Sequence, residues 1–185
     1  MKKILKIIYK MDKVDYMEND LNENKYLYGE IENTVFIKAI GNSTMKNSKT
    51  VSDILDKLLC NDKKELILDM SECRYVDSTF LGLIAKYAME IKMKWGTSLN
   101  ILNPTESVST GLKQTGIEKF INKIENRDLD NLNIEEIQTK DFDNKMEKSK
   151  YILAMHKTLM NLNEQNKETF KNVVDLMEKS INTQE

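Results

Sequence analysis

Apolar residues between positions 26 and 124 follow two alternating patterns. Short apolar runs of strand length lie at residues 26–28, 34–40, 66–68 and 99–102. Between these runs, apolar side chains recur every three or four positions, which is the spacing of one face of a helix. The stripes predict helices over residues 47–60, 79–95 and 105–115, with one further apolar turn over residues 117–124. Because strands alternate with helices, we predict an α/β fold in which helices pack on a small mixed sheet.

The last part of the chain is predicted to be mainly helical. Residues 126–143 are acidic and rich in Asn, and we interpret them as a linker with one short edge strand near residues 134–137. Residues 144–185 contain two apolar stripes separated by an Asn-rich segment at 161–166, which suits a helix end followed by a new cap. We therefore predict a C-terminal helical hairpin. It either covers its own domain, which we favour, or contacts a second chain or a regulator.

Residues 1–24 form a tail before the predicted domain, which spans residues 25–125. Part of this tail has an amphipathic helical pattern, with lysines opposite an apolar face. That face consists of Ile4, Ile7, Ile8 and Met11. A basic amphipathic helix can lie on a membrane surface, so residues 1–11 are a candidate for such contact. We favour the alternatives, in which the segment docks on its own domain or is a frayed tail.

Composition narrows the possible partners and compartments. The 185 residues include 28 basic and 30 acidic side chains, and the net charge of −2 gives no electrostatic drive toward nucleic acid. The sequence has no signal-peptide pattern and no apolar stretch long enough to span a membrane. Its two cysteines, Cys60 and Cys73, have neither metal-site spacing nor the density of a secreted disulfide scaffold. We therefore expect a cytoplasmic protein with reduced thiols and no direct nucleic-acid partner.

The sequence carries no recognisable catalytic signature. It has no Walker loop, no Gly-rich dinucleotide turn, no nucleophile elbow and no metal-ligand spacing. His156 is the only histidine, and no carboxylate partner that would complete a nucleophile–base pair can be identified. We interpret His156 as a helix-face residue that could pair with a nearby acid. The sequence thus predicts a protein that is not an enzyme and that holds no cofactor or metal.

A polar cluster, Asp77-Ser78-Thr79, lies where the helix after the strand at residues 66–68 begins. A helix start leaves N–H groups unpaired and carries partial positive charge, so it favours an acceptor side chain or a phosphate. Ser78 can therefore be a helix cap worth about 1 kcal/mol or a phosphorylation site, and Thr79 is the alternative acceptor. Asp77 can be a second cap, or it can orient the attack of a kinase or phosphatase on Ser78.

The rest of that helix shows a clear apolar stripe. The stripe consists of Phe80, Ile84, Tyr87, Ile91 and Trp95. Gly82 lies beside it, and we expect this glycine to let the helix approach the sheet closely.

These residues also carry a family resemblance. Residues 30–125 resemble a STAS domain, the fold of anti-sigma factor antagonists and of cytoplasmic parts of some anion transporters. In those antagonists a buried strand is followed by Asp-Ser-(Ser/Thr)-Gly-Leu-Gly, and residues 77–82 of this chain agree at five of the six positions. The resemblance implies that Ser78 is phosphorylated by an anti-sigma factor kinase. The one departure within the motif is Phe80, which replaces Gly on the turn that a partner approaches.

A second departure lies after the predicted strand at residues 34–40. The family usually has an acidic residue there, near the phospho-acceptor, and Thr44 falls at that position in this chain. The resemblance implies a partner-binding surface around Ser78, to which we assign Asp77, Thr79, Phe80 and Thr44.

The resemblance also implies a function. Unphosphorylated, the protein would bind an anti-sigma factor of the serine-kinase type and so release a sigma factor. Phosphorylated on Ser78, it would dissociate, and a serine phosphatase would reset it. Two alternatives remain open: a STAS-like accessory subunit of a membrane transport complex, and a non-phosphorylated scaffold that oligomerises through its C-terminal helices.

Overall fold

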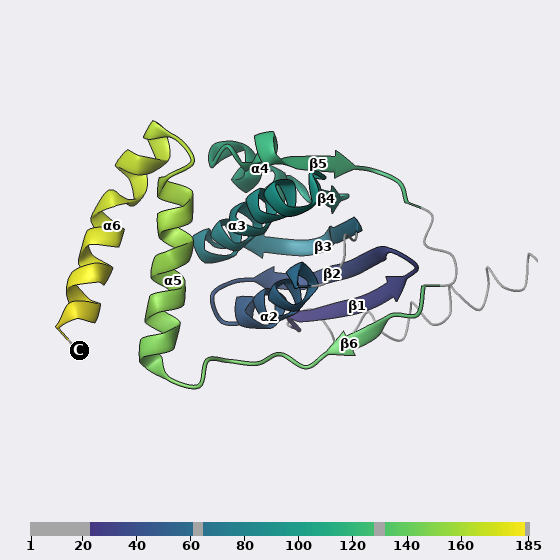
Figure 1. Ribbon diagram of the computed structural model, residues 1–185, viewed down its shortest axis with the longest axis horizontal. Coiled ribbons are helices and arrows are strands. Elements are labelled where there is room, and N and C mark those ends of the chain that lie inside the picture. Colours follow the sequence, from purple (N-terminus) through teal and green to yellow (C-terminus); the bar gives the residue numbers. More distant parts are fainter. Residues whose placement is uncertain (1–22, 61–64, 128–131, 184–185) are drawn as a thin grey trace, which may run out of the picture.

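The structure is a computed structural model that describes residues 23–60, 65–127 and 132–183. Its centre is a mixed sheet with the strand order β5-β4-β3-β2-β1-β6 (Figure 1). The strands are β1 (Lys25–Ile31), β2 (Thr34–Ser43), β3 (Glu65–Val76), β4 (Leu99–Leu102), β5 (Ile121–Ile124) and β6 (Glu135–Ile137). β1 pairs antiparallel with β2 and β6, whereas β2 to β5 pair in parallel.

Helices pack on one face of this sheet (Figure 1). The helices are α2 (Ser48–Leu59), α3 (Ser78–Trp95), α4 (Glu106–Gln114), the 3-10 helix η1 (Ile117–Phe120), α5 (Lys145–Met160) and α6 (Glu164–Asn182). Alternate side chains of a strand point to opposite faces. Val35 and Ile37 of β2 accordingly join the main core under the helices, whereas Phe36 joins a smaller cluster on the other face. The predicted α/β fold with a small mixed sheet is confirmed.

The strands on either side of the sheet centre are longer than predicted. β2 continues beyond residue 40 to Ser43, and β3 continues through residues 72–76, well beyond the apolar run at residues 66–68 from which it was predicted. These polar extensions pair with each other through two register shifts. Gly41 of β2 lies between the two register shifts and has a φ of +80°, a positive value that favours glycine. The extensions bring Ser43 and Val76 side by side next to the start of α3.

The predicted apolar turn over residues 117–124 is wrong in its second half, because residues 121–124 form strand β5 beside β4. The edge strand near residues 134–137 is confirmed as β6. The predicted helical tail segment, residues 1–11, and the helix break at residues 61–64 lie outside the described residues. Among the helices described, none has the length and apolar character needed to cross a membrane.

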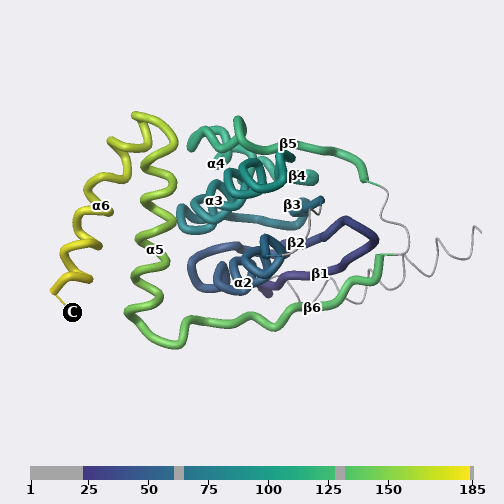
Figure 2. The backbone as a smooth tube through the Cα atoms, in the orientation of Figure 1, coloured from purple at the N-terminus to yellow at the C-terminus, as the bar shows by residue number. Residues whose placement is uncertain are grey.

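The chain changes edges of the sheet before it reaches its C-terminal helices. Figure 2 shows β5 and β6 at opposite edges, so the segment between them passes from one side of the sheet to the other. After β6 the chain runs to α5, which lies across the end of the domain at which β3 ends and α3 begins (Figure 1). α5 packs against α3, and α6 packs mainly against α5. The C-terminal helices thus cover their own domain.

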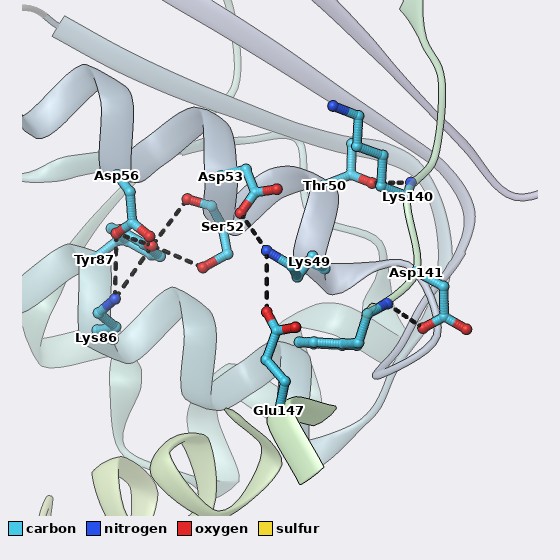
Figure 3. A network of polar contacts seen from close by, with 11 residues as sticks. Lys49, Thr50, Ser52, Asp53, Asp56, Lys86, Tyr87, Lys140, Asp141 and Glu147 are labelled. Atoms are coloured by element: carbon cyan, nitrogen blue, oxygen red, sulfur yellow. Dashed lines mark hydrogen bonds and ion pairs between the residues drawn. The ribbon is translucent and has the colours of Figure 1, made fainter. Parts of the chain in front are cut away.

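Polar contacts fix the lower end of α5 to α2 (Figure 3). The Lys49 ammonium lies 2.8 Å from an Asp53 carboxylate oxygen within α2 and 3.6 Å from one of Glu147 on α5. The Lys140 amide donates to the Thr50 hydroxyl at 2.8 Å. These contacts hold the segment that leads into α5 against the first turns of α2.

Two buried tyrosines, Tyr26 and Tyr87, and the half-buried Tyr151 make stability sensitive to alkaline pH. Desolvation is the main cause that raises the pKa of all three above the ordinary value of 10.0, and it raises that of Tyr151 to about 12. Above pH 10 the unfolded chain releases these protons while the folded protein retains them, so rising pH favours unfolding. We expect the effect of these tyrosines on the free energy of unfolding to be absent below about pH 10 and to lower that free energy between pH 10 and 12.

Denaturant unfolding between pH 8 and 12 measures this effect. Tyr151→Phe removes one of the three groups, so its stability should fall less steeply than that of the parent over the same range. Identical slopes for the parent and Tyr151→Phe would contradict the assignment to this tyrosine.

Candidate functional site

The site is built where β3 passes into α3. Asp77 lies between them with extended backbone angles and is the N-cap of α3. One carboxylate oxygen accepts the Phe80 amide at 2.9 Å, and the other accepts the Met45 amide at 2.8 Å. Of the two alternatives for Ser78, the helix cap is therefore excluded, because Asp77 performs that role and Ser78 is the first helical residue. Asp77 also ties the helix start to the loop after β2.

The Ser78 hydroxyl has a partner from the far end of the chain. Its oxygen lies 3.0 Å from Nε2 of His156 on α5. Nδ1 of His156 lies 3.0 Å from the Ile152 carbonyl oxygen, which can only accept. Nδ1 thus carries the proton that is donated to this carbonyl, and in the corresponding neutral tautomer Nε2 can accept a hydrogen bond from the Ser78 hydroxyl. His156 pairs with this serine rather than with the acid that we had expected.

Thr79 and Phe80 point into the protein. Their exposed fractions are 2% and 0%, and the Phe80 ring stacks on that of Tyr26 with centroids 6.2 Å apart. Contrary to our prediction, neither side chain can contact a partner in this structure. The Thr79 hydroxyl is thus buried, whereas Ser78 is half-buried.

The loop between β2 and α2 forms the neighbouring wall of the site. Thr44, which is half-buried, lies in this loop, and its amide donates to the Asn47 side-chain oxygen at 2.8 Å. The Asn47 amide group donates in turn to the Asn42 carbonyl at 2.8 Å. Sequence reasoning missed Asn47 because a single Asn before a helix reads as an ordinary cap. In the structure its side chain instead holds the loop together.

Exposed apolar side chains flank the capping aspartate. Met45 follows Thr44 and is 38% exposed, and Tyr75 lies two residues before Asp77 and is 51% exposed. Sequence reasoning missed both, because they fall in segments that it interpreted as connections. Together with Thr44 and Asp77 they form the accessible surface around the start of α3, which we call the α3 entry surface. Large exposed apolar side chains beside polar ones are typical of protein contact surfaces.

Gly82 lies one turn into α3 and allows α5 to approach. A methyl group at this position would lie 2.5 Å from the Met155 carbonyl oxygen. The glycine thus serves contact with α5, rather than contact with the sheet as we had expected. Met155 and His156 are 3% and 8% exposed, so this stretch of α5 is buried against the site.

The chemistry available here is that of a hydroxyl at a helix N-terminus. Phosphate on such a hydroxyl is favoured by the first-turn N–H groups and by the helix dipole. Within the described parts of the chain, no three His, Cys, Asp or Glu side chains come together as a metal site. Cys73 at the nearby end of β3 is fully buried, and burial raises the pKa of its thiol, which disfavours the reactive thiolate.

Comparisons with known proteins give likenesses to solved structures and to one protein family. Among solved structures, a candidate anti-sigma factor antagonist of Thermotoga maritima is 19% identical, with 54% of this chain and 85% of that one covered and a TM-score of 0.49. The anti-sigma factor antagonist SpoIIAA in its unphosphorylated form is 16% identical over 54% of this chain and 87% of its own, with a TM-score of 0.44. SLC26A9 is 16% identical over 60% of this chain and 23% of its own, with a TM-score of 0.36. No curated protein sequence matches the chain.

The family comparison is the one that assigns the chain. The STAS domain family matches residues 27–129, which is more than half of the 185 residues. This segment contains β1 to β5 and helices α2 to α4, and α5 and α6 follow it. The chain belongs to the STAS domain family and adds a C-terminal helical hairpin to it.

Proposed function

We propose that this protein is an anti-sigma factor antagonist that is switched by phosphorylation of Ser78. Unphosphorylated, it binds an anti-sigma factor of the serine-kinase type through the α3 entry surface and so releases a sigma factor. Phosphorylated, it dissociates, and a serine phosphatase restores the binding form. It acts in the cytoplasm as a binding module, without catalysis of its own.

One observation carries this proposal: Ser78 is placed at the start of α3 but does not cap it. Because Asp77 accepts the Phe80 amide, the Ser78 hydroxyl is not needed to terminate the helix. A phosphate on Ser78 would add about −1.5 to −2 charges beside the Asp77 carboxylate. The helix N-terminus would stabilise this charge within the fold. On the α3 entry surface, however, the charge would repel an acidic partner and would be costly to bury against an apolar one, so the contacts of Met45 and Tyr75 with that partner would be lost. Phosphorylation would thus change binding while leaving the domain folded.

Phosphopeptide mass spectrometry on protein purified from its own cells tests the proposal. Trypsin cleaves after Arg74 and Lys86, and the peptide between them contains Ser78 and Thr79 as its only serine or threonine residues. Fragment ions separate the two acceptors. We expect a phosphate on Ser78 in a fraction of molecules that varies with growth or stress.

A Ser78→Ala variant expressed in the same cells is the control, and its peptide should carry no phosphate. Absence of phosphate on the parent peptide under all growth and stress conditions would overturn the switch. The helix start would then serve as a docking surface without phosphorylation, as in the transport-accessory or scaffold alternatives.

A further inference from the structure

Helix α5 covers the residue to which we assign the switch. Nε2 of its His156 lies 3.0 Å from the Ser78 hydroxyl oxygen, and its backbone at Met155 lies directly over Gly82. Leu159, one turn further on, is fully buried in the main core cluster. The hydroxyl to which we assign phosphorylation is therefore engaged by α5.

A phosphoryl group on Ser78 disrupts the contact that docked α5 makes with it. A phosphorus atom with three oxygens does not fit between a hydroxyl oxygen and a ring nitrogen that are 3.0 Å apart, so phosphorylation breaks the Ser78–His156 hydrogen bond. The Met155 backbone lies directly over Gly82, which prevents a small adjustment of α3 in that direction. Phosphorylation of Ser78 and docking of α5 therefore oppose each other.

The two C-terminal helices are built to move as one unit. Lys157 on α5 and Glu178 on α6 form an ion pair at 2.6 Å, and the rings of His156 and Phe170 lie 5.7 Å apart. Residues 138–144, which join β6 to α5, are mostly exposed and contain no helix or strand. The hairpin therefore keeps its internal contacts if it separates from α3. Its separation also breaks the Lys49–Glu147 ion pair, and residues 141–144, which follow the anchored Lys140, can act as the hinge.

A few polar contacts close the cover at its tip. The Asn166 side chain donates to the Thr115 carbonyl, beyond the end of α4, at 3.0 Å and to the Leu159 carbonyl at 2.9 Å. The Asn163 side chain donates to the same Thr115 carbonyl at 3.2 Å. The two bonds to Thr115 hold the α5–α6 turn against the domain and are lost when the hairpin leaves, whereas the Asn166–Leu159 bond lies within the hairpin and is kept.

We propose that the α5–α6 hairpin is an autoinhibitory cover of Ser78 and of the α3 surface around Gly82. This inference rests on the proposed role of Ser78. A kinase reaches the Ser78 hydroxyl only in molecules whose hairpin has undocked. The coupling between docking and phosphorylation is reciprocal. If docking of α5 lowers the equilibrium constant for phosphorylation by some factor, phosphate on Ser78 lowers the equilibrium constant for docking of the hairpin by the same factor.

Gly82→Ala is the variant that tests the cover from the α3 side. The added methyl group meets the Met155 carbonyl oxygen at 2.5 Å and forces α5 away. Alanine has the higher helix propensity, so α3 itself is not weakened. Gly111→Ala is the matched control, because it also adds a methyl group to a helix. The atom nearest to this methyl group, 3.3 Å away, is at the flexible end of the Leu81 side chain, and the next two belong to Leu81 and Val76 rather than to α5.

Leu159→Asp tests the same interface from the α5 side. This variant places a charge on a fully buried position of the hairpin and leaves the residues of the sheet and of α3 unchanged. Undocking by both variants would assign the effect to the interface, since one alters α3 and the other alters α5.

The readout is the reactivity of a thiol placed at the acceptor position. Ser78→Cys is combined with Cys60→Ser, because Cys60 is exposed, and the protein is treated with N-ethylmaleimide. We expect alkylation at position 78 to be at least tenfold faster with Gly82→Ala or Leu159→Asp and unchanged with Gly111→Ala. Hydrogen exchange of residues 145–160 should accelerate in the same two variants.

Buried Cys73 distinguishes opening of the cover from unfolding of the domain. It should remain unreactive in all variants. If it reacts together with the introduced thiol, α5 is part of the core and the proposal is overturned. Equal rates at position 78 in all variants would overturn it as well. This assay needs no kinase, so it can succeed or fail independently of the phosphopeptide experiment.

Discussion

Ser78→Asp is expected to weaken binding of the anti-sigma partner at least about thirtyfold, which corresponds to ~2 kcal/mol. The new carboxylate would lie next to Asp77 and close to Met45 and Tyr75. Binding would remove this pair of like charges from water against the partner, and like-charge juxtaposition or an unpaired charge at an interface costs several kcal/mol. The fold should survive, because a negative charge in the first turn of α3 is favourable.

Two substitutions separate charge from size. Ser78→Ala should retain affinity, and Ser78→Asn, which has nearly the shape of Asp without its charge, should bind much better than Ser78→Asp. The partner for titration calorimetry is the kinase-type anti-sigma factor that co-purifies with Ser78→Ala from native cells. Carrying out the series in the Gly82→Ala background removes competition from α5. Equal affinities of Ser78→Asp and Ser78→Ala would refute the charge-based switch.

Phe80→Ala is expected to lower the free energy of unfolding by about 3–5 kcal/mol. The Phe80 side chain is fully buried, and its ring is stacked on that of Tyr26 with an interplanar angle of 5°. Truncation removes this aromatic contact and leaves a cavity beneath the start of α3. The residue that departs from the family motif is therefore a core residue, and its substitution should affect stability before it affects partner recognition.

Urea denaturation of Phe80→Ala and Met93→Ala measures the difference. Met93 lies on the same helix and is 83% exposed, so its truncation should change stability by no more than about 0.5 kcal/mol. If Phe80→Ala were as mild as Met93→Ala, the assignment of Phe80 to the core would have to be abandoned.

Phe80 also shows how sequence reasoning can point in two directions. The helical periodicity placed it on an apolar stripe with Ile84 and Tyr87, and the structure buries all three. The family motif, in contrast, suggested a partner-facing position, because the family has Gly there. Periodicity was the better guide, since it reports burial in this chain, whereas a motif reports what related chains place at the same position.

The parts that sequence reasoning missed depend on contacts between distant segments. Residues 72–76 are too polar and irregular to read as a strand, and only pairing with the end of β2 makes them one. His156 and Ser78 are separated by 78 positions, and no local pattern brings a helix from the C-terminal hairpin to the start of α3. The α/β fold was predictable because buried strands and helices leave a periodic signal in the sequence.

The separation between Ser78 and His156 also has a consequence during synthesis. A ribosome adds the serine 78 residues before the histidine that will cover it. At the usual ~5–20 residues per second, the acceptor precedes its cover by roughly 4–16 s. The nascent chain thus passes through an interval in which β3 and α3 exist and α5 does not. During that interval Ser78 is not covered in any newly made molecule, because the residues of α5 have not yet been added. This holds whatever position the hairpin takes later.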